Sequence, residues 1–131
     1  MSVEAVVDRF FAAVEAGDTT SLTEIYSPDA GVWHNYDDVT QTREESLRTL
    51  GYLHHVAGPM RYTDVRRELL PDGVVQQHVV ELSGRAAGLR MPAMLRIVVD
   101  GDHVVRIEEY VDPTPLNARL TQTGTDKNGS N

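Results

Sequence analysis

The chain has 131 residues, of which 40% are hydrophobic, so it is long enough to bury the core of one domain. It carries 20 acidic against 12 basic residues, a net charge of −8, which argues against binding to nucleic acid or to an anionic membrane surface. It contains no cysteine, which excludes disulfides, thiolate metal sites and a cysteine nucleophile. No stretch is apolar enough to span a bilayer, and acidic residues stand at the N-terminus where a signal peptide has basic ones, so we expect a cytoplasmic protein.

The N-terminal part has the pattern of two helices followed by a strand. Hydrophobic residues at helical spacing predict a helix between Ser2, which can cap it, and Gly17, which can end it. A shorter helix is expected over residues 20–26, stopped by Pro28. Residues 30–35 then resemble a short strand, and the Asp-rich stretch 36–40 a turn or loop.

Thr42 and Glu45 have the spacing of a capping box, which predicts the start of a third helix. It should run to about Val56 and end at Gly58 and Pro59. Its inward positions are predicted to be Leu47, Leu50 and either Leu53 or Tyr52.

From Met60 onward the pattern changes to strands, expected over residues 60–70, 74–83, 89–99 and 103–112. Pro92 suggests that the third of these strands is an edge strand or carries a bulge. Helices first and an antiparallel meander afterwards predict an α+β fold, with three N-terminal helices against the concave side of a curved sheet that forms a cone with a pocket. We expect one domain over residues 1–120 and a disordered tail over 121–131, which lacks an apolar anchor.

The last strand contains a carboxylate where an apolar side chain is expected. By alternation, Glu109 shares a face with Val105, Ile107 and Val111, while the charged residues of this strand lie on the other face. A carboxylate in such a place must find a partner or line a wet cavity. The alternative is a glutamate that bends out to solvent or pairs with an arginine.

A second polar interruption occurs at Gln76, Gln77 and His78, inside a strand that is otherwise rich in valine. His78 shares its face with Val80 and Leu82, whereas Glu81 lies on the opposite face with Gln77. Only one of the two faces can line the cavity, and the sequence leaves open which one does.

Motifs for metal or phosphate binding are not apparent. His54 and His55 are adjacent on a helix and point about 100° apart, so they cannot chelate one ion by themselves. No glycine-rich phosphate loop and no nucleophile elbow is present. We therefore expect no metal and no cofactor.

Three stretches resemble the nuclear transport factor two-like superfamily, which includes SnoaL-like polyketide cyclases, ketosteroid isomerases and limonene epoxide hydrolases. They are the stretches 10–18 (FFAAVEAGD), 26–34 (YSPDAGVWH) and 104–112 (VVRIEEYVD). With the element order, the resemblance covers roughly residues 3–115. It implies the cone-shaped fold, but this scaffold hosts many chemistries as well as plain binding modules.

The resemblance also suggests functional positions. His34, five residues after Asp29, stands where the isomerases have their catalytic aspartate, and a histidine can act there as a base. Phe10 replaces the isomerase tyrosine, and Leu95 stands near the position of the second isomerase aspartate, so that oxyanion hole is missing. Glu109 matches a catalytic aspartate of the epoxide hydrolases, but Val79 replaces their arginine.

These observations together predict a cofactor-free general acid–base enzyme, an isomerase, cyclase or hydrolase for an apolar, ring-containing polyketide-, terpenoid- or steroid-like molecule. The candidate catalytic residues are His34, Glu109 and His78, and the candidate substrate-binding residues are Trp33, Asn35, Gln76 and Glu81. The alternative is a non-catalytic binding or interaction module, for which Glu109 should pair with an arginine such as Arg90 or Arg96 and His34 should lie outside the cavity. The bare outer face of the sheet predicts a homodimer.

Overall fold

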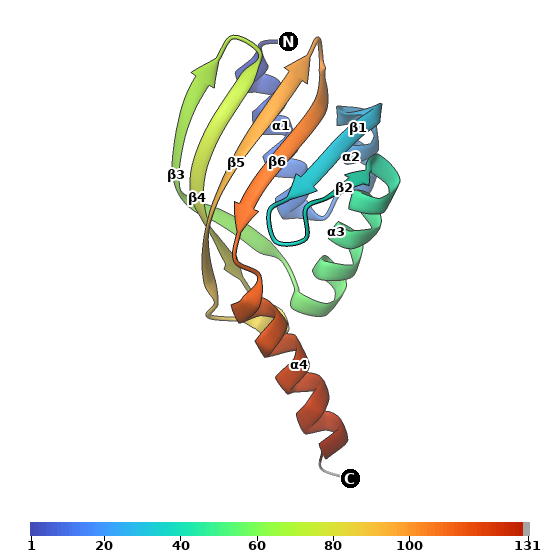
Figure 1. The fold of residues 1–131 in the computed structure, drawn as a ribbon, viewed down its shortest axis with the longest axis vertical. Coiled ribbons are helices and arrows are strands. Elements are labelled where there is room, and N and C mark those ends of the chain that lie inside the picture. The colour runs from blue at the N-terminus through green and yellow to red at the C-terminus, as the bar shows by residue number, and fades with distance from the viewer. Residues whose placement is uncertain (130–131) are drawn as a thin grey trace.

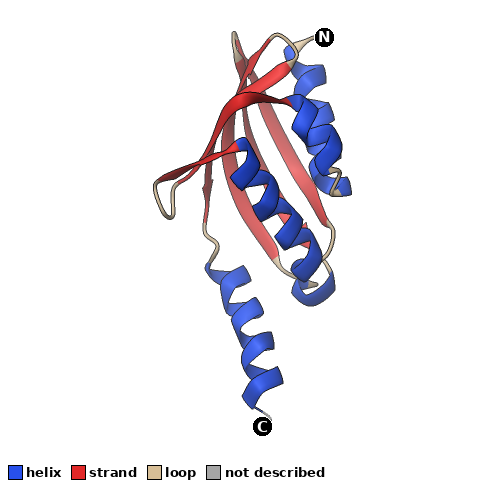
Figure 2. Ribbon diagram, turned by 90° about the vertical axis from the view of Figure 1, so that its right-hand side faces the viewer, coloured by secondary structure: helices blue, strands red, loops and turns tan. Residues whose placement is uncertain are grey.

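The computed structural model describes the backbone of residues 1–129 and the side chains of residues 1–121. A curved sheet is covered on its concave face by three helices, and a fourth helix extends from one end of the body (Figure 1, Figure 2). The strand order is β2-β1-β6-β5-β4-β3, and every neighbouring pair is antiparallel except β1 and β6. The expected α+β fold with a curved, mostly antiparallel sheet is confirmed.

The first two helices form where local signals predict them. Helix α1 spans Val3–Ala16, with Ser2 Oγ accepting a hydrogen bond from the Ala5 N–H. Gly17 ends it at φ 67°, a left-handed conformation that glycine adopts without steric cost. Helix α2 spans Thr19–Ile25 and is capped by Asp18. With both ends of α1 fixed in this way, its apolar side packs against the sheet.

Strand β1 spans Tyr26–His34. It begins earlier than the expected residue 30 and includes Pro28. The pairing of β1 with β6 is irregular between Tyr26 and Gly31, and a proline without an N–H is tolerated where the ladder is interrupted. Part of the stretch expected as a loop is a short edge strand, β2, over Val39–Thr42. The turn between β1 and β2 contains Asp38 at φ 55°.

Helix α3 spans Arg43–Ala57 and begins with the predicted capping box, in which both reciprocal hydrogen bonds between Thr42 and Glu45 are present. Leu53 is partly buried against the core, whereas Tyr52 is 61% exposed, so the inward position is Leu53.

The meander contains strands β3 (Met60–Leu70), β4 (Gly73–Leu82), β5 (Arg90–Asp100) and β6 (His103–Val111), all within a residue or so of the expected bounds. A short 3₁₀ helix, η1, spans Gly84–Ala86. Strand β5 lies inside the sheet, but β6 ends opposite Ala93, so Pro92 sits where β5 has become an edge on that side. A bulge between Val98 and Val99 shifts the register of β6.

Helix α4 spans Thr114–Gly129, where the sequence analysis predicted no element. Its first turns carry Leu116, which is buried, and Leu120, which packs partly against the core. The expected disorder of residues 121–131 stays a prediction, and positions 130 and 131 lie outside the described residues. No helix in the described part of the chain is long and apolar enough to cross a membrane.

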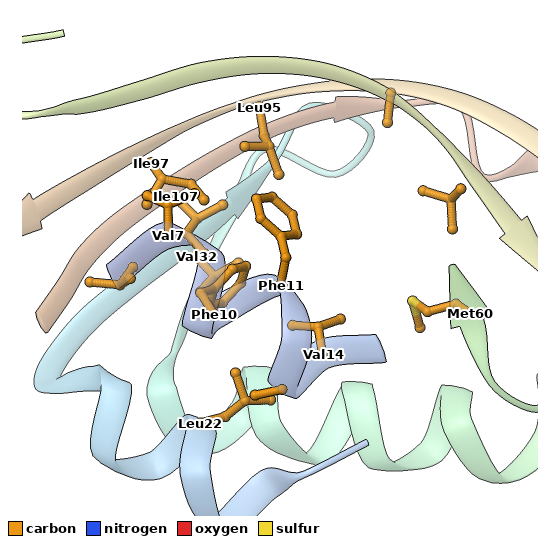
Figure 3. Packing of buried hydrophobic residues seen from close by; sticks show 14 of the residues in the cluster. Val7, Phe10, Phe11, Val14, Leu22, Val32, Met60, Leu95, Ile97 and Ile107 are labelled. Carbon is orange, nitrogen blue, oxygen red and sulfur yellow. The ribbon is translucent and has the colours of Figure 1, made fainter. Parts of the chain in front are cut away.

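The core lies between α1 and the concave face of the sheet (Figure 3). Phe10 and Phe11 project from α1 toward the strands, with ring centroids 5.2 Å apart in an edge-to-face arrangement. Leu95, Ile97 and Ile107 meet them from β5 and β6. Many of these core residues also form the wall of a space between α1, α3 and the sheet.

Candidate active site

A cavity of about 160 Å³ lies between helices α1 and α3 and the sheet. Its wall is mainly apolar and is contributed by both helices, by the inner face of β1 and β3–β6, and by the start of α4. The apolar lining residues are Phe10, Val14, Val32, Leu50, Leu53, Ala57, Met60, Val80, Leu82, Met91, Leu95, Ile107, Val111, Pro113 and Leu116. Such a cavity suits an apolar ligand that is oriented by a few polar groups.

His34 and Glu109 are the titratable pair in this cavity. His34 Nε2 lies 3.1 Å from Glu109 Oε1, and the two side chains are 15% and 20% exposed. The contact follows from the sheet, because β1 runs parallel to β6 with His34 directly opposite Glu109. Residues 34 and 109 are far apart in the chain, and only this pairing brings an imidazole and a carboxylate to one place.

Neither arginine expected for a non-catalytic module contacts Glu109. Arg90 pairs with Glu81 and Asp64, at 2.6 and 3.2 Å. Arg96 lies 3.5 Å from Asp72 and 3.9 Å from Glu108. The ion-pair partner of Glu109 among the described residues is therefore His34, not an arginine.

Three tyrosines line the same cavity as Glu109 and were not identified from the sequence. Burial raises the pKa of Tyr26 and of Tyr62, and the charge of Glu109 raises both further. Burial also raises the pKa of Tyr36, again with contributions from the charges of Asp37 and Glu109. At neutral pH all three phenols stay protonated, so each is a hydrogen-bond donor on the cavity wall.

Tyr36 lies at the exposed side of the cavity and is 48% exposed. Its ring centroid is 5.1 Å from that of His34, with an angle of 31° between the ring planes. Tyr36 therefore covers the imidazole and restricts its orientation. Sequence could not identify it, because it lies in the turn after β1, where no periodicity indicates direction.

A row of paired residues crosses the inner face of the sheet in register. It runs from His34 through Glu109, Leu95 and Gln76 to Arg67, one residue on each of five strands. Leu95 is the one apolar member. It separates the pair in the cavity from a buried polar network at the other end of the row.

That network fixes the state of His78. Arg67 Nε donates a 2.8 Å hydrogen bond to Gln76 Oε1, so the Gln76 amide N–H₂ is the group that donates to His78 Nδ1, at 2.9 Å. The remaining hydrogen of the neutral ring is therefore on Nε2, which is buried and has no hydrogen-bond partner among the described residues. Burial lowers the pKa of His78, opposed by the charge of Glu109.

His78 lies on the inner face of the sheet, only 3% exposed, and Glu81 lies on the outer face. The His78 ring is nevertheless not part of the cavity wall, because it packs edge-to-face against Tyr62, with centroids 4.7 Å apart. Gln76, 1% exposed, is likewise held in the network behind the wall.

The candidate binding residues Trp33 and Asn35 make contacts that stabilise the sheet. Trp33 alternates away from the cavity, donates a 2.7 Å hydrogen bond to Asp38 and packs against Tyr110 on the outer face. Asn35 Oδ1 accepts a 2.9 Å hydrogen bond from the Val111 N–H, which ties the end of β1 to β6. Neither residue lines the cavity.

No group of three or more metal-ligating side chains occurs among the residues whose side chains are described. The polar groups of the cavity are one imidazole, one carboxylate, three phenols and the side chains of Gln41, Ser46 and Thr49. Such a set can move protons and hold oxygen atoms of a ligand.

Comparison with known proteins shows the fold. No family model and no curated protein matches the chain. Among solved structures, IdmH, a proposed polyketide cyclase from Streptomyces antibioticus, is 16% identical with a TM-score of 0.77, over 92% of this chain and 99% of that chain. A protein from Shewanella putrefaciens, described as a proposed SnoaL-like polyketide cyclase, is 14% identical with a TM-score of 0.78, over 93% and 88% of the two chains.

A protein from Catenulispora acidiphila with a ketosteroid isomerase-like fold is 14% identical with a TM-score of 0.72, over 92% of this chain and 95% of that chain. The chain therefore has the nuclear transport factor two-like fold that its sequence motifs resemble. At these identities the likeness concerns the fold.

Proposed function

We propose that the protein is a cofactor-free general acid–base enzyme acting on an apolar, ring-containing small molecule. The observation that carries this proposal is the 3.1 Å contact between His34 Nε2 and Glu109 Oε1 in a mainly apolar cavity. A binding module needs the apolar walls, but it gains nothing from a titratable pair held inside them.

The chemistry follows from which atoms of the pair remain available. One hydrogen occupies the contact between Nε2 and Oε1. Within the described part of the chain, no other hydrogen bond reaches His34 Nδ1 or the second carboxylate oxygen of Glu109. The pair can therefore take a proton from a ligand or a water at one atom and return a proton at another.

The size of the cavity and the likeness in fold both support an apolar, ring-containing substrate. The cavity is slightly larger than an engineered apolar cavity of about 150 Å³ that binds benzene, so it has room for a ring. The likeness to proposed polyketide cyclases and to a ketosteroid isomerase-like fold supports a polyketide-, terpenoid- or steroid-like substrate. Isomerisation, cyclisation and hydration are the reactions that such a pair supports.

Two small probes test the proposal and separate proton abstraction from water addition. Wild-type protein in deuterated water should exchange the α-hydrogens of 1-indanone, followed by NMR, or convert styrene oxide to its diol, followed by chromatography. His34→Ala and Glu109→Gln should each lower the rate about 10²- to 10⁴-fold. Tyr52→Phe is the matched control, because Tyr52 is 61% exposed and does not line the cavity.

Equal rates in all four proteins would contradict the proposal. Binding of both probes without turnover would favour the alternative, a module that holds a small apolar ligand.

A further inference from the structure

Tyr62 occupies the cavity wall on β3, the edge strand farthest from β1 in the sheet. Its backbone N–H donates a 2.9 Å hydrogen bond to Glu15 Oε2 on α1. Its ring packs against those of Phe11 and His78, with centroid distances of 4.8 and 4.7 Å, and these two rings also contact each other at 5.8 Å. These contacts hold the phenol in one orientation.

The hydroxyl of Tyr62 has only a weak partner. It donates to the thioether sulfur of Met60 at 3.8 Å, and a thioether is a poor acceptor. Tyr26, in contrast, has the side chain of Ser46 beside its hydroxyl, and this contact lowers the pKa of the phenol, against the larger effect of burial. A buried O–H group gains most from an oxygen acceptor, because leaving such a donor poorly satisfied costs its desolvation.

Tyr62 and Glu109 line the same cavity, and the charge of Glu109 raises the pKa of Tyr62. The phenol stays protonated because burial opposes its ionisation. The cavity therefore presents a permanent donor on β3 and a proton-transferring pair where β1 meets β6.

We propose that the Tyr62 hydroxyl is the ligand-binding donor of the cavity, and that the ligand carries an acceptor oxygen, a carbonyl or an ether, directed at β3. This inference rests on the proposed function only in taking the cavity as the ligand site. It supplies a polar contact that the sequence did not indicate, since Phe10 and Leu95 replace the donors expected from the resemblance.

A matched pair of probes tests the assignment by binding alone. 1-Indanone and indane have nearly the same shape, and only the ketone has an acceptor oxygen. Their dissociation constants are measured by NMR titration for wild-type protein, Tyr62→Phe and Tyr26→Phe. Removal of the Tyr62 hydroxyl should weaken 1-indanone about 2- to 10-fold and leave indane unchanged.

Tyr26→Phe should keep the wild-type ratio of the two constants, because Tyr26 lies at the start of β1, whereas the acceptor oxygen is directed at β3. In the infrared, the carbonyl band of bound 1-indanone should lie at lower frequency in wild type than in Tyr62→Phe. An unchanged ratio and an unchanged carbonyl band in Tyr62→Phe would overturn the inference.

The outcomes separate this inference from the proposed function. A ketone preference that depends on Tyr62 in a protein without turnover would refute the enzyme and retain the donor. Turnover without a ketone preference that depends on Tyr62 would retain the enzyme and refute the donor. Failure of wild-type protein to bind either probe would overturn both.

Discussion

The substitution Glu109→Gln tests whether the His34–Glu109 contact serves chemistry or stability. Glutamine has the same shape as glutamate, and its amide can still hydrogen-bond to His34 Nε2. A hydrogen bond to a charged group contributes about 1.5–3 kcal/mol, and a neutral one about 1 kcal/mol. The exchange should therefore cost at most about 2 kcal/mol in the free energy of unfolding, and less if removing a partly buried charge offsets the loss.

Urea denaturation followed by circular dichroism measures this difference. Leu95→Ala is the control, because Leu95 lies directly opposite Glu109 in the sheet and is 4% exposed. Truncation of a buried leucine typically costs about 2–5 kcal/mol. The expected order is wild type, then Glu109→Gln close below it, and Leu95→Ala clearly least stable.

A loss beyond about 3 kcal/mol for Glu109→Gln would show that the contact is a structural ion pair and would refute this reasoning. Near-native stability combined with the loss of probe turnover would instead locate the role of Glu109 in the reaction.

Two further predictions follow from the same structure. Because burial lowers the pKa of His78, the unfolded chain binds a proton near pH 6.5 that the folded protein binds only at lower pH, so stability should fall as the pH drops below about 6.5. His78→Gln should reduce this slope, by at most about 1.4 kcal/mol per pH unit, in urea titrations at pH 7, 6 and 5, while exposed His103→Gln should not. We also propose a homodimer formed through the outer face of the sheet, where Met94 and Tyr110 are 41% and 55% exposed. Light scattering should then give twice the chain mass of 14.5 kDa, and a monomer mass at micromolar concentration would exclude it.

Sequence predicted the elements that carry their own local signals. The capping box of Thr42 and Glu45 and the left-handed glycine at position 17 depend on a few neighbouring residues, and both occur as expected. Strand β2 and helix α4 were missed, because β2 exists through its pairing with β1 and α4 packs through few buried side chains such as Leu116.

The site shows the same division. Alternation placed Glu109 on the inner face correctly, but a bulge at Val105 of β6, opposite Val98 and Val99 of β5, makes Val104, not Val105, the fully buried valine. A register shift of this kind depends on the neighbouring strand and leaves no mark in the sequence of β6. Tyr62 alternates with Met60 and could have been placed inward by period alone, whereas nothing in the sequence indicated that its hydroxyl would face only a thioether.

Leu95 lies between two groups of polar side chains on the inner face of the sheet. On one side lie His34 and Glu109, open to ligand, and on the other lie Gln76 and Arg67, which with His78 form a buried network leading to Asp8 at the surface. In the row of paired residues, Leu95 is the one member whose side chain can neither donate nor accept a hydrogen bond. Replacing Leu95 by a residue with a carboxylate or an amide would make the row of polar side chains across the sheet continuous. A single substitution at position 95 would thus link the polar groups of the cavity, through Gln76 and Arg67, to Asp8 at the protein surface.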